Sequence, residues 1–293
     1  MNAVRVGGTA TAAPVGVRTD GVIAKAGSEN FPVALRVLPR RVRADLVTIY
    51  AYARLVDDIG DLSEGDRLAE LEWVEAEFER SLANDATEPI LRRAGELALR
   101  LETGRAPFLD LIEANRRDQR VSRYATYDEL ATYCALSANP VGRLVLAVFD
   151  VDDAEMVGLS DDVCTGLQLV EHWQDVAEDF QSGRVYLPAE DLARFGVAEE
   201  TIANRAPTAA FRRLMAFECA RARRLLGSGE KLATRLSGWA RVAISGFVGG
   251  GEAQLDAIEG RGFDVFSGLV KASRPSVALH ALRIWNRAAR VRP

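Results

Sequence analysis

One stretch of the sequence, ADLVTIYAYARLVDDIGD at residues 44–61, constrains the fold more than any other. Its first part is apolar on nearly every side, which predicts a helix buried in the protein interior. The stretch ends in Asp57, Asp58 and Asp61. Asp57 and Asp61 are four residues apart and therefore share one helix face, about 5–6 Å apart at Cβ. Like charges at this spacing destabilise a helix, so we expect another group to neutralise them.

A divalent cation is the simplest partner for these aspartates. Oxygen ligands suit Mg²⁺, and Mg²⁺ in proteins is commonly bound together with a phosphate. The alternative is an acidic helix end that is simply solvated.

A second acidic cluster lies in GLQLVEHWQDVAEDF, within a helix expected to run from Ser160 to Phe180. At about 100° per residue, its polar side chains cover one stripe roughly 120° wide, and the opposite side is apolar. The stripe contains Gln168, Glu171, His172, Asp175, Glu178 and Asp179, and the apolar side contains Leu169, Val170, Trp173 and Val176. Two such clusters, each ending an apolar helix, favour a metal centre over two solvated helix faces.

The composition excludes several other kinds of protein. The net charge of −5 gives no reason to expect nucleic acid as a partner, and two histidines argue against a multi-histidine zinc site. Cys134, Cys164 and Cys219 form no CxxC pair, which indicates free thiols in a reducing cytoplasm. No apolar stretch approaches the ~18–20 residues that a membrane-spanning helix needs.

The rest of the chain predicts an all-α protein. Residues 1–26 are expected to form a disordered leader, and residues 27–293 a single helical domain. The short segment GRVYLP is expected to be extended. Besides the two acidic helices, we expect helices over 28–38, 64–83, 88–101, 107–121, 126–136, 142–149, 188–195, 207–226, 230–248, 251–259 and 275–292.

Two acidic helices that face one another across an apolar cavity suggest a definite chemistry. They would hold Mg²⁺ ions, which would bind the diphosphate of an allylic substrate and withdraw it as a leaving group. The resulting carbocation needs walls that attract a cation without reacting with it, and aromatic faces suit this purpose. The candidates for such walls are Phe31, Tyr50, Tyr52, Tyr133 and Trp173. For each of them, ordinary core packing is the alternative.

The sequence resembles the squalene/phytoene synthase family from about Ser28 to its C-terminus. The segments that carry the resemblance are ENFPVALRVLP, YAYARLVDDIGD, YCALSANPVGRLVL, LQLVEHWQDVAEDF and GRVYLP. The combination of ENFP with SANPVGRLVL is most similar to bacterial hydroxysqualene synthases of hopanoid pathways. The resemblance implies a class I isoprenoid-synthase helical bundle with a central cavity and Mg²⁺ as cofactor.

The resemblance also implies functional positions. It assigns metal binding to Asp57, Asp58, Asp61, Glu171, Asp175 and Asp179, and catalysis to Asp57, Asp61, Asp175 and Asp179. It assigns substrate binding to Ser28, Phe31, Tyr50, Arg54, Ala138, Val141, Gly142, Gln168, His172, Arg184 and Tyr186. Simpler alternatives are helix capping for Ser28, an i,i+4 ion pair for Arg54, and a hydrogen-bonded helix histidine for His172.

The chain departs from the family pattern at three places. Glu171 and His172 stand where many members have an asparagine ligand and its neighbour. Phe263-Asp264-Val265 replaces Tyr-Asp-Val, and the basic stretch that follows is reduced to Lys271 and Arg274. These departures leave open a prenyltransferase that alkylates a small aromatic compound, a presqualene diphosphate or phytoene-type synthase, and a non-catalytic helical partner protein.

The expected activity is conversion of presqualene diphosphate and water to hydroxysqualene and diphosphate. The expected partners are a prenyl diphosphate and other enzymes of the squalene pathway, with no nucleic acid. The expected location is cytoplasmic. The basic, amphipathic C-terminal helix suggests in addition a peripheral contact with an anionic membrane, with a solvated helix end as the alternative.

Overall fold

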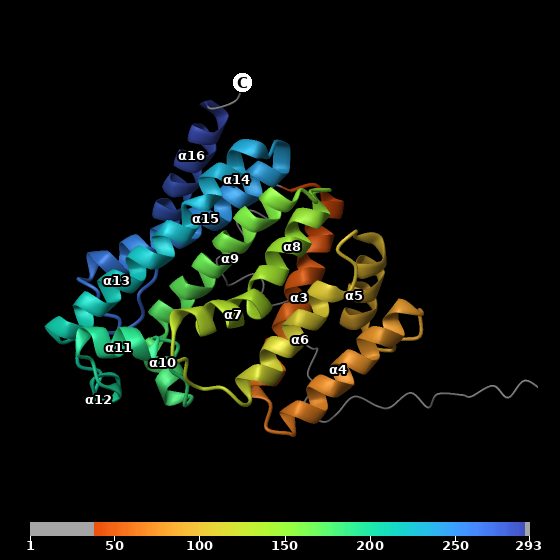
Figure 1. Ribbon diagram of the computed structural model, residues 1–293. Helices are drawn as coiled ribbons and strands as arrows, with labels where there is room; N and C mark the ends of the chain where they lie inside the picture. The colour runs from red at the N-terminus through yellow and green to blue at the C-terminus, as the bar shows by residue number, and fades with distance from the viewer. Residues whose placement is uncertain (1–37, 291–293) are drawn as a thin grey trace, which may run out of the picture.

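The computed structural model describes residues 38–290 (Figure 1). Within this range the chain is all-α, and the only β-type pairing is an isolated bridge between Arg123 and Val185. The helices are α3 (Arg40–Leu62), α4 (Arg67–Leu82), α5 (Pro89–Arg100), α6 (Ala106–Asp118), α7 (Tyr127–Ser137), α8 (Asn139–Val148), α9 (Ala154–Gln174), α10 (Val176–Gln181), α11 (Ala189–Phe195), α12 (Glu199–Ala203), α13 (Ala209–Leu226), α14 (Ser228–Arg235), α15 (Gly238–Gly260) and α16 (Arg274–Arg290).

The helices form two groups joined through the middle of the molecule. In the first group, α3 packs against α4, α5 and α6. In the second, α9 packs against α13, α14 and α15, and α16 lies along α15. The helix α8 contacts both α3 and α9, so it connects the two groups (Figure 1). One continuous hydrophobic core runs through both groups.

The buried position expected for α3 is confirmed. Tyr52 is fully buried, and its ring lies 5.6 Å from the Phe78 ring and 5.0 Å from the Phe108 ring. The Tyr52 hydroxyl donates a hydrogen bond of 3.0 Å to the Phe108 carbonyl oxygen. Aromatic pairs of this kind contribute about 0.5–1.5 kcal/mol each beyond their burial. The cluster fixes α3 against α4 and α6, and thereby fixes the position of the aspartates at its end.

The interruption expected at Asn139-Pro140 separates α7 from α8. Buried Asn139 accepts a hydrogen bond of 3.0 Å from the Thr165 hydroxyl of α9. A Cβ at Gly142 would lie 2.4 Å from the Cys164 sulfur and 2.6 Å from the Ser160 hydroxyl. The absence of a side chain at Gly142 therefore allows α8 to lie close against α9.

The prediction of one continuous helix from Ser160 to Phe180 is wrong in detail. The α9 helix starts earlier, at Ala154, and a break at Asp175 separates it from α10. Asp175 has φ −101° and ψ 18°, outside the α-helical region. Because of the break, the predicted polar stripe is not one flat face, and the Glu178 side chain is exposed.

The predicted division of residues 230–259 is also wrong. The chain breaks after α14 at Leu236 and Ser237, and α15 continues through Gly249, Gly250 and Gly251. Glycine disfavours a helix interior, which suggested an end there. Tertiary packing overrides this preference, because a Cβ at Gly249 would lie 2.5 Å from the Ala281 backbone nitrogen of α16.

None of the helices within residues 38–290 combines the length and apolar character that crossing a bilayer requires. The three cysteines are free, as expected from their spacing. The predicted leader and the predicted helix over 28–38, with Ser28 and Phe31, lie outside the described residues.

Candidate active site

Asp57 lies at the C-terminal end of α3, beside α6. Asp57 retains solvent exposure, and its carboxylate accepts a hydrogen bond of 3.0 Å from the Asn115 amide. Desolvation by the surrounding protein raises the pKa of Asp57 to about 7, against the lowering effect of Asn115. The negative charge of Asp61 raises this pKa further. A carboxylate in this environment favours a bound cation.

Three polar residues at the C-terminal end of α6 lie near this end of α3, and the sequence patterns did not single them out. Asn115 reaches Asp57, and Gln119 donates a hydrogen bond of 3.1 Å to the Gly60 carbonyl oxygen. The third is Asp118. A Cβ at Gly60 would lie 2.0 Å from the Asn115 side-chain oxygen, so only glycine leaves room for Asn115. The sequence feature that could have indicated them is the spacing of Asn115, Asp118 and Gln119 in EANRRDQR, which places them on one side of a helix.

Arg54 and Asp58 form an ion pair of 2.8 Å on α3. This confirms the i,i+4 pairing that was the simpler explanation for Arg54. Both residues are partly buried, so the guanidinium is held at the edge of the aspartate cluster.

The second acidic cluster is built on the break between α9 and α10. Asp175 accepts a hydrogen bond of 2.9 Å from the Gln174 amide, and burial raises its pKa. Burial, followed by the charge of Asp175, raises the pKa of Asp179 to about 8. Glu171, one turn earlier, is exposed. Arg184 is the nearby cation of this cluster, and its charge lowers the pKa of Asp179 against the effect of burial.

Arg184 connects the two clusters. Its guanidinium donates a hydrogen bond of 2.5 Å to the Asp61 carboxylate, and its backbone N–H donates one of 2.8 Å to the Asp179 carbonyl oxygen. Asp61 and Asp179 are near enough that the charge of Asp61 raises the Asp179 pKa. The C-terminal ends of α3 and α9 therefore lie near one another.

A stack of rings lines the side of this space. The His172 ring stacks on the Tyr186 ring at 3.7 Å between centroids, and Tyr133 and Tyr124 continue the stack at 5.8 Å from Tyr186. Burial and the charge of Arg184 lower the pKa of His172 to about 3, so His172 is neutral at pH 7. The side-chain amide nitrogen of Gln168 lies 3.3 Å from the Nε2 atom of His172.

Asp118 ends this stack. The Tyr133 hydroxyl donates a hydrogen bond of 2.6 Å to one carboxylate oxygen, and the other oxygen is buried without a hydrogen-bond partner in the described part of the chain. Burial raises the pKa of Asp118 to about 6. Asp118 is therefore an additional member of the site.

A small cavity of about 10 Å³ lies between the second cluster and the ring stack. This is about the space that one water molecule needs. Its lining residues are His172, Val176, Asp179, Arg184, Val185, Tyr186 and Leu187.

The donors fit Mg²⁺ in the way that phosphate-binding enzymes use it. Within residues 38–290, no group of three or more His, Cys, Asp or Glu side chains is arranged to hold a metal ion by itself. Mg²⁺ is usually held by one or two carboxylates, with water and substrate phosphates completing its shell. The elevated pKa values of Asp57 and Asp179 and the unpaired oxygen of Asp118 indicate a site with too little positive charge.

The remaining predicted residues are distributed as follows. Tyr50 lies on α3 two turns before Asp57, and Val141 and Ala138 lie at the α7–α8 kink. Gly142 faces α9 rather than an open space, as described above, and channel lining by these residues stays a prediction.

Comparison with known proteins gives the family. The family model for squalene/phytoene synthase matches residues 24–276. A crystal structure of squalene synthase HpnC from Alicyclobacillus acidocaldarius superimposes with a TM-score of 0.77 at 40% identity, covering 83% of this chain and 92% of the other. The chain belongs to the squalene/phytoene synthase family, and its fold is the isoprenoid-synthase helical bundle of that family.

The relatives carry more than one product name. A hydroxysqualene synthase of Rhodopseudomonas palustris is 36% identical over 217 residues, covering 71% of both chains. A phytoene synthase of Mycobacterium tuberculosis is 29% identical over 268 residues, covering 88% of both chains. The similarity therefore establishes a prenyl-diphosphate-utilising synthase and leaves the particular reaction to the proposal below.

Proposed function

We propose that the protein converts presqualene diphosphate and water to hydroxysqualene and diphosphate, with Mg²⁺ as cofactor. The observation that carries the proposal is that Arg184 bonds the Asp61 carboxylate of one cluster and the Asp179 backbone of the other. The 36% identity to a hydroxysqualene synthase supports the choice of reaction. In this reaction the carbon–oxygen bond to diphosphate breaks, a new bond forms to the oxygen of water, and one proton is released.

The carboxylates would hold Mg²⁺, which when bound supplies the positive charge that stabilises the leaving diphosphate. Asp57 and Asp61 would contribute from α3, and Asp175 and Asp179 from the α9–α10 break. Asp58 and Glu171 are further candidate ligands. Arg184 would turn from Asp61 to the departing oxygens, because a guanidinium binds phosphate through paired hydrogen bonds.

The ring stack suits the cationic half of the reaction. Neutral His172 and the faces of Tyr186 and Tyr133 can stabilise positive charge on the carbon chain without a strong nucleophile. His172 lies in the wall of the small cavity, where it could accept a hydrogen bond from the water that attacks. Asp118 would hold the Tyr133 hydroxyl in place.

Product analysis tests the proposal. The purified full-length protein is incubated with Mg²⁺ and presqualene diphosphate, and we expect hydroxysqualene and free diphosphate. A parallel reaction with EDTA should give neither. Squalene as the main product, or no turnover with Mg²⁺, would contradict the proposal.

A phytoene-type condensation of two prenyl diphosphates is the second candidate function. It is supported by the phytoene synthase relative, which matches a larger share of the chain. Incubation with geranylgeranyl diphosphate separates the two reactions. Formation of a head-to-head hydrocarbon from this substrate, with presqualene diphosphate left untouched, would favour the second candidate.

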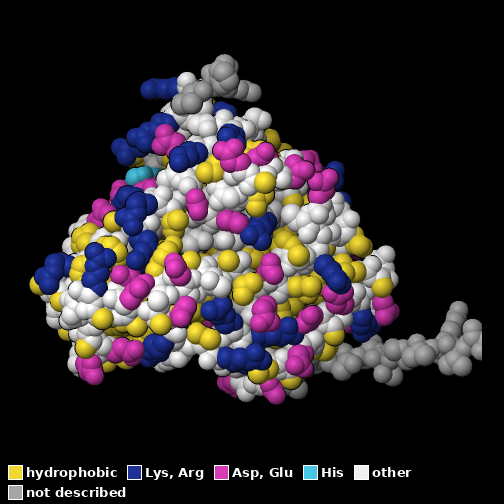
Figure 2. Space-filling model, viewed as in Figure 1, with side chains coloured by type: hydrophobic (Ala, Val, Ile, Leu, Met, Phe, Trp, Pro, Cys, Tyr) yellow, Lys and Arg dark blue, Asp and Glu magenta, His cyan; other side chains and the backbone are white. Residues whose placement is uncertain are grey.

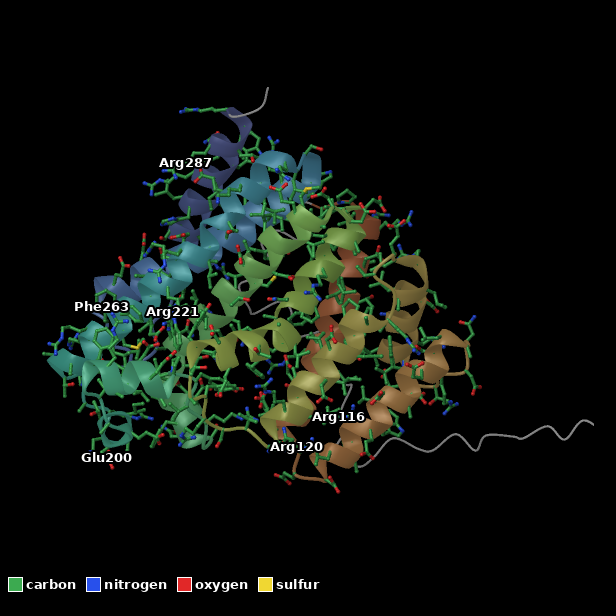
Figure 3. All side chains as sticks on the ribbon, viewed as in Figure 1. Arg116, Arg120, Glu200, Arg221, Phe263 and Arg287 are labelled. Atoms are coloured by element: carbon green, nitrogen blue, oxygen red, sulfur yellow. The ribbon has the colours of Figure 1, made fainter. Side chains whose placement is uncertain are left out.

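We further propose that α16 contacts an anionic membrane, where an apolar product could leave the enzyme. Leu279, Leu282 and Trp285 are 47%, 53% and 41% exposed, and their spacing of three places them along one side of the helix. Lys and Arg side chains gather at the upper end of the molecule in Figure 2, where Figure 1 places α16, and Arg287 points outward from this helix in Figure 3. Such a face fits an interfacial helix.

Vesicle flotation tests this contact on the full chain. We expect flotation with vesicles that contain phosphatidylglycerol, and loss of flotation for Leu282→Asp/Trp285→Asp. The exposed apolar residue Leu99 of α5 provides the control Leu99→Asp, which should float normally. Equal flotation of all three proteins would contradict the contact.

A further inference from the structure

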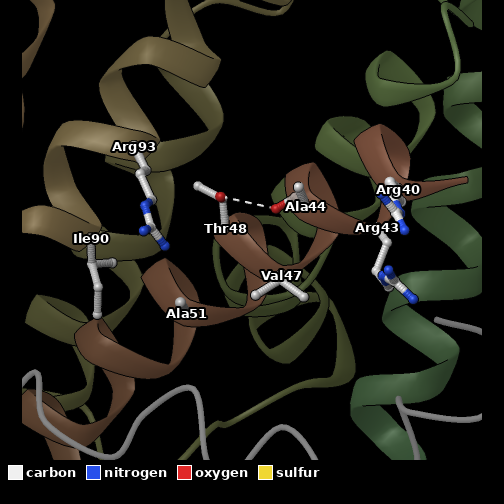
Figure 4. A pocket seen from close by; sticks show the side chains of 8 residues that line it. All are labelled: Arg40, Arg43, Ala44, Val47, Thr48, Ala51, Ile90 and Arg93. Atoms are coloured by element: carbon white, nitrogen blue, oxygen red, sulfur yellow. Dashed lines mark hydrogen bonds between the residues drawn. The ribbon is translucent and has the colours of Figure 1, made fainter. Parts of the chain in front are cut away.

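A pocket lies away from the acidic clusters, between the N-terminal half of α3 and the first half of α5 (Figure 4). Its volume is about 490 Å³, within the usual range for small-molecule sites of about 300–1,000 Å³. Arg43 and Asp57 are separated by fourteen residues of the same helix, which corresponds to about 21 Å along its axis. The pocket is therefore separate from the candidate active site.

Three arginines line this pocket. Arg40 and Arg43 come from α3 at one end, and Arg93 reaches over from α5 at the other (Figure 4). Among residues 38–290, none of these three guanidinium groups has a carboxylate or hydrogen-bonding partner. This differs from the neighbouring Arg100, which pairs with Asp45 at 2.6 Å. The pocket thus carries positive charge that the described part of the protein leaves unneutralised.

The position of these arginines is unfavourable for the helix itself. The N-terminal end of a helix carries partial positive charge and favours acidic residues. The first turn of α3 contains no acidic residue, and its N-cap residue, Pro39, provides no side-chain hydrogen bond. An anion bound at Arg40 and Arg43 would neutralise both the side chains and the helix end.

The floor of the pocket is apolar. It consists of Ala44, Val47 and Ala51 of α3 and Ile90 of α5. The Thr48 hydroxyl donates a hydrogen bond of 3.0 Å to the Ala44 carbonyl oxygen, so that donor is already used within the helix. A ligand that matches this surface needs an anionic group for the arginines and an apolar part for the floor.

We infer that this pocket binds a phosphate-bearing amphiphile, with the phosphate or diphosphate on the arginines and the apolar chain along Val47, Ala51 and Ile90. Arginine favours phosphate through its planar, bidentate donors. A free prenyl diphosphate and a membrane phospholipid share this chemistry. The inference does not depend on the proposed reaction.

Calorimetry in EDTA tests the site on the full chain, because metal-dependent binding at the acidic clusters is then suppressed. The pocket variant is Arg43→Gln/Arg93→Gln. The matched control is Arg41→Gln/Arg92→Gln, which removes the same charges from neighbouring exposed positions that do not line the pocket. The probes are farnesyl diphosphate and inorganic diphosphate.

We expect farnesyl diphosphate to bind the wild-type protein, and its affinity to fall by at least about tenfold in the pocket variant. The control variant should stay within about twofold of wild type, because its arginines lie outside the site. Inorganic diphosphate should bind about tenfold more weakly than farnesyl diphosphate, since it leaves the apolar floor uncovered. Asp57→Ala should retain the binding, so failure of the proposed reaction would not affect this result.

Flotation with phosphatidylglycerol vesicles distinguishes the two sources of the ligand. Dependence of flotation on Arg43 and Arg93, without binding of farnesyl diphosphate, would identify a phospholipid. Equal behaviour of the pocket and control variants, both with farnesyl diphosphate and in flotation, would overturn the inference. Equal affinity for inorganic and farnesyl diphosphate would overturn its amphiphile part.

Discussion

The two ends of α3 carry opposite charges, and both are unfavourable for a helix. Arginines lie at its N-terminal end, where the helix favours negative charge, and Asp57, Asp58 and Asp61 lie at its C-terminal end, where it favours positive charge. The middle of the helix is buried in the core, through residues such as Tyr52. The core therefore supplies the stability that allows both ends to be used for binding.

Several other charged side chains in the described part of the chain are neutralised locally. Arg221 pairs with Asp191 at 2.9 Å, and Arg223 pairs with the three acidic residues Glu252, Asp256 and Glu259. In Figure 3, Arg221 lies on α13, well away from Arg116 on α6. The two ends of α3 differ, because each carries more charge of one sign than the neighbouring residues balance with opposite charge. Five predictions test this difference, beginning with the largest expected effect.

Removal of one aspartate from either cluster should abolish turnover. For Asp57→Ala and Asp175→Ala we expect a loss of at least about 10³-fold in kcat, because each removes charge that holds the diphosphate in the transition state. Helix content measured by circular dichroism should be unchanged. The control Glu64→Ala changes an exposed acid three residues beyond Asp61 and should be active. Near-normal activity of either aspartate variant would refute the two-cluster site.

Arg184→Gln should reduce kcat/KM by about 10²-fold, because it removes the guanidinium that lies between the clusters. Arg184→Lys keeps the charge but loses the planar donors, and it should recover only part of the activity. Steady-state kinetics at several Mg²⁺ concentrations measure both variants. Identical kinetics for wild type and Arg184→Gln would show that Arg184 is structural only.

Gly60→Ala should destabilise the protein by about 1–3 kcal/mol, because its Cβ would collide with the Asn115 side chain. Asn115 would then lose its hydrogen bond to Asp57. Gly158→Ala is the matched control on α9, where no atom lies within 4 Å of the added Cβ. It should be neutral or stabilising by up to about 1 kcal/mol. Urea unfolding measures both, and equal stabilities would contradict the prediction.

The stability of the protein should decrease as the pH rises, through Glu218. Burial raises the pKa of this fully buried carboxyl to about 8, although Arg221 lowers it. Between its unfolded value of about 4.5 and pH 8, the folded state binds more protons than the unfolded state. Glu218 can therefore cost at most about 1.4 kcal/mol per pH unit in this window. Urea unfolding of Glu218→Gln should show a flatter pH profile, and an unchanged slope would contradict the assignment.

Arg40→Glu should stabilise the ligand-free protein slightly, by about 0.3–1 kcal/mol, because it places a negative charge at the N-terminal end of α3. The control Arg92→Glu changes the fourth residue of α5, further from the helix N-terminus than Arg40 is in α3, and should have a smaller effect. Urea unfolding at low ionic strength measures this difference. Destabilisation by Arg40→Glu would mean that the arginine has a structural partner.

The local patterns of the sequence predicted the helices well where the pattern was strong. The buried helix that ends in Asp61, the Thr126 cap of α7 and the interruption at Asn139-Pro140 all occur as expected. The errors lie where tertiary contacts override local preference. The glycines of α15 are inside a helix because α16 packs directly against Gly249, and this contact is invisible in the local sequence.

The sequence by itself determined that this protein is helical and that two carboxylate clusters end apolar helices, because helical periodicity and charge spacing are local properties. Only the tertiary structure decided that Arg184 meets Asp61, and that Asn115 meets Asp57 from 58 residues away. It also decided that Arg43 and Arg93 line one pocket. These contacts depend on how helices pack against one another, and the spacing of residues along one helix cannot specify its neighbour.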